Sequence, residues 1–435
     1  MITNKKRQYK VLWLSSLPPF PLIANSTNFS GGWLSGAYGS IKTSQDIDLI
    51  MMFPVSKRLG EVKGHIDGFK YFGFSLPRIL KLFKIKFLQK IIYRRIFNKI
   101  IQTVNPDILH VFGTEELYSR MAIESFNNPK NTVIHIQGLA SVYAHHSLFG
   151  FPFWARHLIV PYSILNGTIY GKSRKFHRAG IDEVQSIKAT DNIMGRTEWD
   201  EACCRAINAS MNYIHCGESL RNVFYDESSQ WNYEDCKKYT VYFSQCNSQV
   251  KGMHLVLPVL PKLIKQYPHF HMYVGGYSPL SDGSLMGYLK KSTLEIYLTK
   301  LINKYKLHNY ITFLGPQNDV QVVQNLKNAH VFLSSSLIEN SPNSVGEAMI
   351  VGTPVISSDV GGVKDFIHHG ENGFIYPMNE PYMIPYYISQ VFEDDTLATR
   401  FSQRGKEVAR GKYDRTENGN IVLDTYRKIG DVKTI

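Results

Sequence analysis

The sequence predicts an α/β protein built from two doubly wound, Rossmann-like domains. Short apolar runs, β-rich and unbroken by charge, recur along the chain, as expected for strands buried on both faces of a parallel sheet. Longer helix-like segments separate them, for example Leu255–Gln266 and Leu294–Tyr305. Repeated strand–helix–strand units of this kind build a doubly wound sheet.

The predicted strands leave room for a helix between most neighbours. In the first half of the chain they are Lys10–Leu14, Leu49–Phe53, Ile108–Phe112, Thr132–Gln137 and Met211–His215; in the second half they are Thr240–Phe243, Phe270–Val274, Tyr310–Phe313, Val331–Ser334 and Pro354–Ser357. In open α/β sheets, ligands bind beyond the carboxyl ends of the strands, where the strand order reverses. With two such sheets, a central cleft between the domains is the expected active site.

Length and composition fit this organisation. The chain has 435 residues, of which 43% are hydrophobic and 20% charged, a globular composition that suits two or three domains. The polar run at residues 226–238 precedes a new strand and is interpreted as a linker. The predicted domains are therefore 1–225 and 226–412. Residues 413–435 are predicted to form a C-terminal helix, for which a return to the N-terminal domain is one option.

The chain is basic, with 49 lysines and arginines against 36 acidic residues and a net charge of +13. Nucleic acid, an anionic membrane and phosphate-bearing substrates are the usual partners of such a balance. No run of about 18 apolar residues indicates a transmembrane helix, and the apolar run at residues 11–14 is too short for a signal-peptide core. Five cysteines without a CxxC pair favour a reducing, cytoplasmic compartment.

The stretch at residues 331–376 carries the strongest chemical signal. A strand ends near Ser334, a polar loop comes next, and a helix is predicted from Asn343 to Gly352, with Asn343 and Ser344 as capping types. A helix start favours a phosphate, whereas the carboxylates of Glu339 and Glu347 can accept hydrogen bonds from sugar hydroxyls. The arrangement fits a sugar joined to a diphosphate. The alternative is that the carboxylates only serve the helix dipole.

This stretch resembles the E-x7-E signature of retaining glycosyltransferases of the GT-B fold, in the large family called GT4. Past that signature, the run Gly352-Thr353-Pro354-Val355-Ile356, the pair Gly361-Gly362 and the run Gly370-Glu371-Asn372-Gly373-Phe374 are similar to the family's own sequence. Three spaced elements are far more specific than two glutamates. The nearest resemblance is to bacterial enzymes that build capsule, lipopolysaccharide or exopolysaccharide. The resemblance implies an acceptor-side N-terminal domain and a nucleotide-sugar-binding C-terminal domain.

The resemblance also implies roles for individual residues. Glu339 would contact the donor sugar at the reaction centre, and Glu347 would bind the ribose hydroxyls of the nucleotide. The backbone around Asn343, Ser344 and Val345 would hold the sugar and diphosphate. Lys251 would neutralise the diphosphate, although a solvated surface lysine is the alternative. The arginine that the family usually places before this lysine is missing, because the sequence reads Ser244-Gln245-Cys246-Asn247-Ser248-Gln249-Val250 there.

The N-terminal domain offers weaker candidates. Gly31 and Gly32 resemble the family's glycine pair at the donor diphosphate, with a plain turn as the alternative. Gln137 falls where many relatives have a histidine near the transferred sugar, and it can bond a hydroxyl but cannot titrate. His110, Glu115, His145 and His146 are candidates for the acceptor side.

No metal or cofactor is expected. The sequence contains neither HExxH nor a Cys/His cluster with zinc spacing, and no dinucleotide or P-loop glycine motif. The D-x-D of Asp46-Ile47-Asp48 spells a metal-binding motif of another glycosyltransferase fold. Because it precedes a predicted strand instead of ending one, we interpret it as coincidence.

The basic charge is concentrated in one stretch. No acidic residue occurs between Asp67 and Asp107, whereas residues 77–101 interleave cations with large apolar side chains. This fits a helix that docks on the sheet with one face and meets an anionic membrane with the other, or else a packed helix with a solvated lysine face. A second candidate is Ser147–Arg178, which is rich in aromatic and basic residues. Peripheral attachment to the inner face of the plasma membrane is the resulting hypothesis.

The expected function is metal-independent transfer of a sugar from a nucleotide-diphosphate sugar to a glycan or lipid-linked acceptor, with retention of configuration, in bacterial surface polysaccharide synthesis. One alternative is a GT-B nucleotide-sugar epimerase or phosphorylase. Another is a basic nucleic-acid- or membrane-binding module. No standard nucleic-acid motif occurs, and the basic stretch is too apolar for an exposed groove-binding face.

Overall fold

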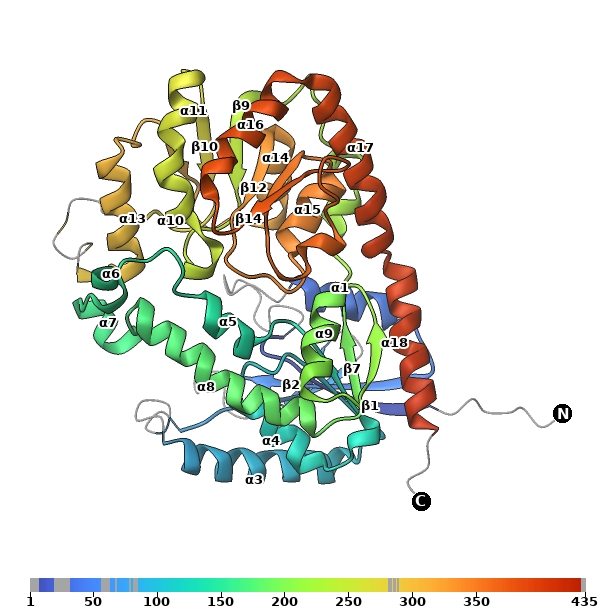
Figure 1. Ribbon diagram of the computed structural model, residues 1–435. Coiled ribbons are helices and arrows are strands. Elements are labelled where there is room, and N and C mark those ends of the chain that lie inside the picture. Colours follow the sequence, from blue (N-terminus) through green and yellow to red (C-terminus); the bar gives the residue numbers. More distant parts are fainter. Residues whose placement is uncertain are drawn as a thin grey trace. The chain divides into compact units, whose positions relative to one another are not determined.

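The computed structural model describes residues 8–431, except 19–31, 56–62, 67–68, 78–79, 81–84, 281–283, 285–286 and 288. The chain divides into two compact units (Figure 1). Unit 1 comprises Met1–Ser141, Arg178–Leu220 and Asp414–Ile435, and unit 2 comprises Val142–His177 and Arg221–Tyr413. The division between Leu220 and Arg221 lies near the predicted linker. The segment 142–177, predicted as part of the N-terminal domain, goes with unit 2.

The described strands of unit 1 form an eight-stranded sheet in the order β3-β4-β2-β1-β5-β6-β7-β8. All its pairs are parallel except β3 with β4. The strands are β1 (Tyr9–Leu14), β2 (Ile47–Pro54), β3 (Lys63–Ile66), β4 (Phe69–Phe74), β5 (Ile108–Phe112), β6 (Thr132–His135), β7 (Asn192–Gly195) and β8 (Asn212–His215). Strands β3, β4 and β7 were not predicted. β3 and β7 are short and carry polar residues or glycine, which weakens the strand signal.

The helices of unit 1 include the last helix of the chain. They are α1 (Gly32–Ile41), α3 (Lys86–Val104), α4 (Leu117–Phe126), α9 (Glu198–Ile207) and α18 (Arg415–Gly430), together with parts of α5 (Ala140–His146) and α8 (Ile169–Lys188). Tyr426 of α18 is fully buried, and its hydroxyl accepts a hydrogen bond of 2.7 Å from the indole of Trp13 in β1. The described residues 414–431 therefore belong to the core of unit 1.

The described strands of unit 2 form a six-stranded parallel sheet in the order β11-β10-β9-β12-β13-β14. They are β9 (Lys237–Phe243), β10 (His271–Val274), β11 (Ile311–Phe313), β12 (Ala329–Ser334), β13 (Val355–Asp359) and β14 (Phe374–Pro377). Strand order proceeds outward from β9 in one direction and from β12 in the other. The two central strands thus mark the topological switch point, which is where ligands bind in such sheets.

The helices of unit 2 include two that match predicted segments, at Leu294–Tyr305 and Asn343–Gly352. They are α6 (Phe153–His157), α7 (Pro161–Asn166), α10 (Met253–Val256), α11 (Leu260–Gln266), α13 (Thr293–Lys304), α14 (Asp319–Asn328), α15 (Asn343–Val351), α16 (Ile384–Glu393) and α17 (Asp395–Lys412). The continuous helix predicted at Leu255–Gln266 is wrong. A 3-10 turn at Leu257–Val259 separates α10 from α11, because Pro258 and Pro261 lack the amide hydrogens that an uninterrupted helix requires.

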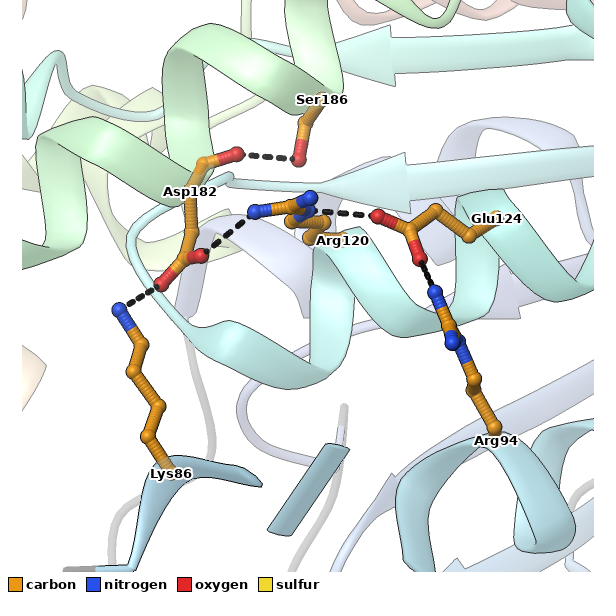
Figure 2. Close-up of polar contacts among 6 residues, drawn as sticks. All are labelled: Lys86, Arg94, Arg120, Glu124, Asp182 and Ser186. Atoms are coloured by element: carbon orange, nitrogen blue, oxygen red, sulfur yellow. Dashed lines mark hydrogen bonds and ion pairs between the residues drawn. The ribbon is translucent and has the colours of Figure 1, made fainter. Parts of the chain in front are cut away.

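Helix α3 contains the described part of the basic stretch, and a network of ion pairs ties it to α4 and α8 (Figure 2). The Nζ of Lys86 lies 2.7 Å from the carboxylate of Asp182, which also binds Arg120 at 3.1 Å. Glu124 binds Arg120 at 2.6 Å and also pairs with Arg94. Two cations of α3, Lys86 and Arg94, are therefore ion-paired within unit 1, to carboxylates that each also bind Arg120. Within the described residues, no helix is long and apolar enough to cross a membrane.

Candidate functional site

The residues predicted to bind the donor gather at the carboxyl ends of β9 and β12. Lys251 ends a 3-10 turn, Gln249–Lys251, in the connection that comes after β9, and Glu339 lies in the loop after β12. The two loops are joined because the amide of Leu337 donates to the carbonyl of Val250 at 2.7 Å. Lys251 and Glu339 are far apart in the sequence, and the parallel sheet brings them to the same edge.

Lys251 and Glu339 form an ion pair at this edge. The Nζ of Lys251 lies 2.5 Å from Oε1 of Glu339, and the Ser336 hydroxyl donates to the same oxygen at 2.6 Å. The Lys251 side chain is 25% exposed and that of Glu339 is 11% exposed. Lys251 is therefore not a fully solvated surface lysine. Its ammonium is partly exposed and is shared with Glu339.

Two glycines permit the backbone around this pair to approach closely. Gly252 has φ of +73°, and a Cβ on it would lie 1.8 Å from the carbonyl oxygen of Ser335. Gly361 has φ of +53°, and a Cβ on it would lie 1.7 Å from the carbonyl oxygen of Glu339. Neither position accommodates a side chain without movement of the backbone. The Gly362 amide also donates to the Glu339 carbonyl at 3.2 Å. Gly361 and Gly362 together therefore fix the backbone of the Glu339 loop.

Helix α15 begins beside this loop. It spans Asn343–Val351 and ends at Gly352 with φ of +94°, which confirms the predicted bounds. The predicted capping role of Asn343 and Ser344 is wrong, because the cap position is Pro342 and no side chain caps the helix. Oδ1 of Asn343 and Oγ of Ser341 are buried without a hydrogen-bond partner among the described residues.

Unpartnered buried polar atoms at a helix start are consistent with a polar ligand, because such atoms are costly when left unsatisfied. The amides of Val345 and Gly346 both bond to the carbonyl of Pro342, so the first turn is formed without any ligand. Val345 is itself buried and can contribute only its backbone.

Glu347 faces a partner that sequence reasoning missed. The guanidinium of Arg221 lies 2.8 Å from Oε1 of Glu347, and the ring of Phe224 lies under that guanidinium at 5.0 Å. Tyr242, near the end of β9, has its pKa raised by burial and by the charge of Glu347. No sequence motif around Arg221 indicates a ligand-binding site. Its place beside Glu347 depends on the path of the chain where it enters unit 2.

In the described loop after β9, no arginine takes the place of the one missing before Lys251. The Asn247 side chain is engaged with the backbone of Tyr277, accepting from its amide at 2.8 Å and donating to its carbonyl at 2.9 Å. Gln245 is exposed and Ser244 is partly buried. In the described part of this loop, Lys251 is therefore the residue that supplies positive charge.

Gly31, the first of the predicted glycine pair in unit 1, lies outside the described residues. Gly32 begins helix α1. The predicted role of this pair at the diphosphate stays a prediction.

His110 lies in the core of unit 1. It is fully buried in β5, its Nδ1 lies 2.5 Å from the Tyr426 hydroxyl, and its ring stacks on Phe112 and His135. Burial lowers its pKa to about 3, so it stays neutral. A side chain without exposed surface cannot meet an acceptor, and the prediction of an acceptor-side role for His110 is not supported.

Glu115 and Gln137 come after neighbouring strands, β5 and β6, and both lie close to Gly113. Gly113 has φ of +84°, and a Cβ on it would lie 2.3 Å from the Glu115 carboxylate and 3.6 Å from Cγ of Gln137. Burial, and then the charge of Glu183, raises the pKa of Glu115 to about 7. The structure therefore brings these two predicted residues together at the carboxyl edge of the unit 1 sheet.

His145 and His146 end helix α5. His145 is exposed, whereas burial and the neighbouring His145 lower the pKa of His146. The start of α5 is held by Glu183 of α8, whose carboxylate accepts from the amides of Ala140 at 2.8 Å and Ser141 at 3.0 Å. Glu183 thus serves the helix start, a role that the sequence did not indicate.

Arg196, for which the sequence suggested no role, organises the same edge of unit 1. It forms an ion pair of 2.7 Å with Glu218, and each side chain is 3% exposed. It also donates to the carbonyls of Ile136 and Gln137, both at 3.2 Å. Arg196 therefore fixes the backbone that carries Gln137.

Asp46, the first residue of the D-x-D run, is engaged elsewhere. Nε of Arg427 in α18 donates to its carboxylate at 3.0 Å. In the described ranges, no group of three or more His, Cys, Asp or Glu side chains is placed to hold a metal ion.

Comparison with known proteins matches residues 225–408 to the family model described as "Glycosyl transferases group 1". Over 132 residues the chain is 31% identical to the lipopolysaccharide core biosynthesis glycosyltransferase LpsE of Rhizobium meliloti, covering 30% of this chain and 37% of that protein. It is 27% identical over 184 residues to spore coat protein SA of Bacillus subtilis, covering 42% and 46% respectively. The chain thus spans less than half the length of these relatives.

Solved structures resemble the chain over nearly its whole length. Sucrose-phosphate synthase from Thermosynechococcus elongatus superposes with a TM-score of 0.71 at 15% identity, covering 97% of this chain and 99% of that one. HepE of Anabaena, solved in complex with UDP-glucose, has a TM-score of 0.65 at 14% identity and covers 97% and 100%. At these identities the likeness establishes the fold. The chain has two Rossmann-like sheets, the architecture of GT-B glycosyltransferases, and its residues 225–408 match the glycosyl transferases group 1 family.

Proposed function

We propose that this protein transfers a sugar from a nucleotide-diphosphate sugar to a glycan or lipid-linked acceptor, with retention of anomeric configuration, in the synthesis of a bacterial surface polysaccharide. The observation that carries the proposal is the Lys251–Glu339 ion pair at the switch point of the unit 2 sheet, beside the uncapped start of α15. Relatives named for lipopolysaccharide core and colanic acid biosynthesis, and the HepE structure with UDP-glucose, support the donor and product classes.

The proposed roles are those that the resemblance implies, and the contacts in unit 2 support them. Lys251 and the amides at the start of α15 stabilise the negative charge of the diphosphate, because both direct positive charge at the same edge of the sheet. Glu347 accepts hydrogen bonds from the ribose hydroxyls, and Arg221 orients its carboxylate. Glu339 contacts the donor sugar, with one of its oxygens held in place by Ser336.

In the proposed reaction, the bond between the anomeric carbon and the diphosphate oxygen breaks while the acceptor oxygen bonds to the same face of that carbon. The acceptor proton passes to the departing phosphate oxygen, so no protein base is needed. The nucleoside diphosphate leaves with the electron pair of the broken bond. The chain then contributes mainly charge stabilisation, through Lys251, and orientation of the sugar, through Glu339.

The test is turnover with a panel of nucleotide sugars and oligosaccharide or lipid-linked acceptors, and then NMR of the product. We expect a new glycosidic bond with the anomeric configuration of the donor. Glu339→Ala is expected to remove transfer while the thermal unfolding profile stays the same. Near-normal turnover of that variant, or an inverted product, would refute the assignment. An epimerised or phosphorolysed sugar without a new glycosidic bond would instead favour the alternative enzyme classes.

We also propose that the reaction requires neither metal nor organic cofactor and takes place in the cytoplasm, at the inner face of the plasma membrane. Transfer is expected to proceed equally with and without EDTA. Loss of turnover in EDTA that is restored by a divalent cation would contradict this part of the proposal.

A further inference from the structure

The segment 151–170 of unit 2 exposes large apolar side chains to an unusual degree. Helices α6 and α7 and their connection carry four of them, each about three quarters exposed: Phe153 at 76%, Ile159 at 75%, Ile164 at 74% and Leu165 at 75%. Scattered exposed apolar residues are ordinary, but several within one short segment mark a binding surface. We call these four the apolar tip.

The apolar tip is mounted on a firmly packed base. Phe151 is buried, and its ring stacks on His254 with the ring centroids 3.7 Å apart. Nε2 of His254 lies 2.9 Å from the Phe149 carbonyl, and Gln249 donates to the Ser147 carbonyl at 2.9 Å. The buried residues of the segment therefore pack against the rest of unit 2, and this packing holds the exposed residues in a defined position.

The same segment also carries aromatic residues with a polar end at intermediate exposure. Trp154 is 42% exposed, with its ring beneath the ammonium of Lys300 at 4.3 Å, and Tyr162 and Tyr170 are 38% and 39% exposed. A segment that combines partly exposed Trp and Tyr with exposed Phe, Ile and Leu has the composition found at membrane–water interfaces, because the amphipathic rings of Trp and Tyr lie at headgroup level.

Charge favours an anionic surface over a protein partner. No aspartate or glutamate occurs between Glu124 and Asp182. Within the same span, Arg174, Lys175 and His177 are exposed on α8, while Arg156 and Lys172 are partly buried. A span that combines exposed apolar side chains with exposed cations, and that has no acid of its own, suits acyl chains beneath anionic headgroups.

We propose that the apolar tip inserts into the interface of an anionic lipid bilayer and that α3 is not the principal docking element. The two segments differ in how their charges are used. Lys86 and Arg94 of α3 are paired with Asp182 and Glu124 in unit 1, whereas Lys90, Arg95 and Lys99 are in none of the ion pairs among the described residues. The span around the tip contains no acid of its own and exposes four large apolar side chains by about three quarters, against Phe87 at 72% and Leu88 at 40% in α3. This inference rests on the membrane location that is part of the proposed function, and it names the segment that would make the contact. It does not depend on the sugar transfer, because no turnover is needed to test it.

The experiment is flotation of the full chain with vesicles of phosphatidylcholine alone or of equal parts phosphatidylcholine and phosphatidylglycerol. We expect binding to the anionic vesicles at low salt and release near 1 M salt, where the Debye length is about 3 Å. Ile164→Gln with Leu165→Gln is expected to weaken binding by about tenfold or more, because two apolar insertions are lost while the helix former glutamine preserves α7. Thermal unfolding checks that the variant folds.

Two matched variants make the test specific. Val320→Gln with Tyr386→Gln alters apolar residues of unit 2 that are also highly exposed, at 62% and 60%, and is expected to leave binding unchanged. Phe87→Gln with Leu88→Gln alters the exposed apolar residues of α3 and is expected to have the smaller effect of the two helix variants. Stronger loss from the α3 variant would overturn the assignment, as would equal binding to neutral vesicles.

A second readout separates lipid from protein partners. Quenching of Trp154 fluorescence by brominated lipid is expected in the wild type, and the difference from a Trp154→Phe variant isolates its contribution. Self-association that is abolished by the Ile164→Gln and Leu165→Gln changes, without vesicle binding, would overturn the proposal in favour of a second copy of the chain. These binding experiments contain no donor sugar. A lack of vesicle binding would therefore leave the proposed sugar transfer unaffected.

Discussion

The two sheets gather charged residues at their carboxyl edges, but they use them differently. In unit 1, Arg196 and Glu218 are almost completely buried and form an ion pair with each other, and the Glu183 carboxylate accepts hydrogen bonds from the amides at the start of α5. In unit 2, Lys251, Glu339, Arg221 and Glu347 are all partly exposed, and two polar atoms at the start of α15 have no partner among the described residues.

This difference separates structural charges from those available to a ligand. A buried pair whose partners are rigidly matched contributes specificity to the fold and becomes destabilising once one partner is removed. A partly exposed pair at a switch point can exchange partners with a substrate at much lower cost. Both kinds look alike in a sequence, since Arg196 and Lys251 are each a cation after a strand.

The largest expected effect is on stability in unit 1. Arg196→Met leaves the Glu218 carboxylate buried without its partner, which should lower the free energy of unfolding by about 3–5 kcal/mol. Thermal unfolding measures this as a reduced Tm. Arg404→Met is the control, because the Arg404–Glu407 pair is exposed and should contribute less than about 1 kcal/mol. An equal decrease in Tm for both variants would show that the buried Arg196–Glu218 pair does not stabilise unit 1 more than an exposed pair does.

The next effect is on turnover in unit 2. Lys251→Met should reduce kcat by about 10²–10³-fold, since it removes a charge proposed to face the diphosphate in the transition state, and it should leave Tm nearly unchanged. Steady-state kinetics with the best donor of the panel provides the measurement. A variant that lost stability but kept turnover would place Lys251 with the structural charges of unit 1.

A smaller effect concerns pH. The pKa of Glu115 is raised from 4.5 to about 7, so the folded state binds more protons than the unfolded state between these values. Stability associated with this group therefore falls as the pH rises through that window. Glu115→Gln should remove this fall and stabilise the protein by about 2 kcal/mol at pH 8. Unfolding curves over a pH series test it; the same pH dependence in both proteins would contradict the assignment.

The smallest effect is expected at Arg221. Arg221→Gln should raise KM for the nucleotide sugar by about tenfold, with a modest change in kcat, because it removes an orienting partner of Glu347 without removing the carboxylate. Arg205→Gln, which alters an exposed pair with Glu201, is the matched control. An unchanged KM would mean that the Arg221–Glu347 pair only supports the helix.

Much of the architecture could be predicted from the sequence, because buried parallel strands are continuous apolar runs and helix ends carry local signals such as Gly352. The E-x7-E spacing pointed to Glu339 and Glu347 by resemblance, and their roles stay a prediction. Prediction was weaker where the local signal was absent. Strand β3 is short and polar, so it has little apolar pattern. The interruption at Leu257–Val259 is caused by two prolines, and in a sequence each of them could equally mark the first turn of a helix.

Sequence by itself determined the alternation of strands and helices and most of the central strands, the concentration of basic charge and the residue types available at the carboxyl edges. Only the tertiary structure decided which charges meet. It paired Lys251 with Glu339 and Arg221 with Glu347, placed His110 in the core against Tyr426, and left Phe153, Ile159, Ile164 and Leu165 exposed. The physical reason is that pairing and burial are set by contacts between residues far apart in the chain, whereas periodicity and capping report only on near neighbours.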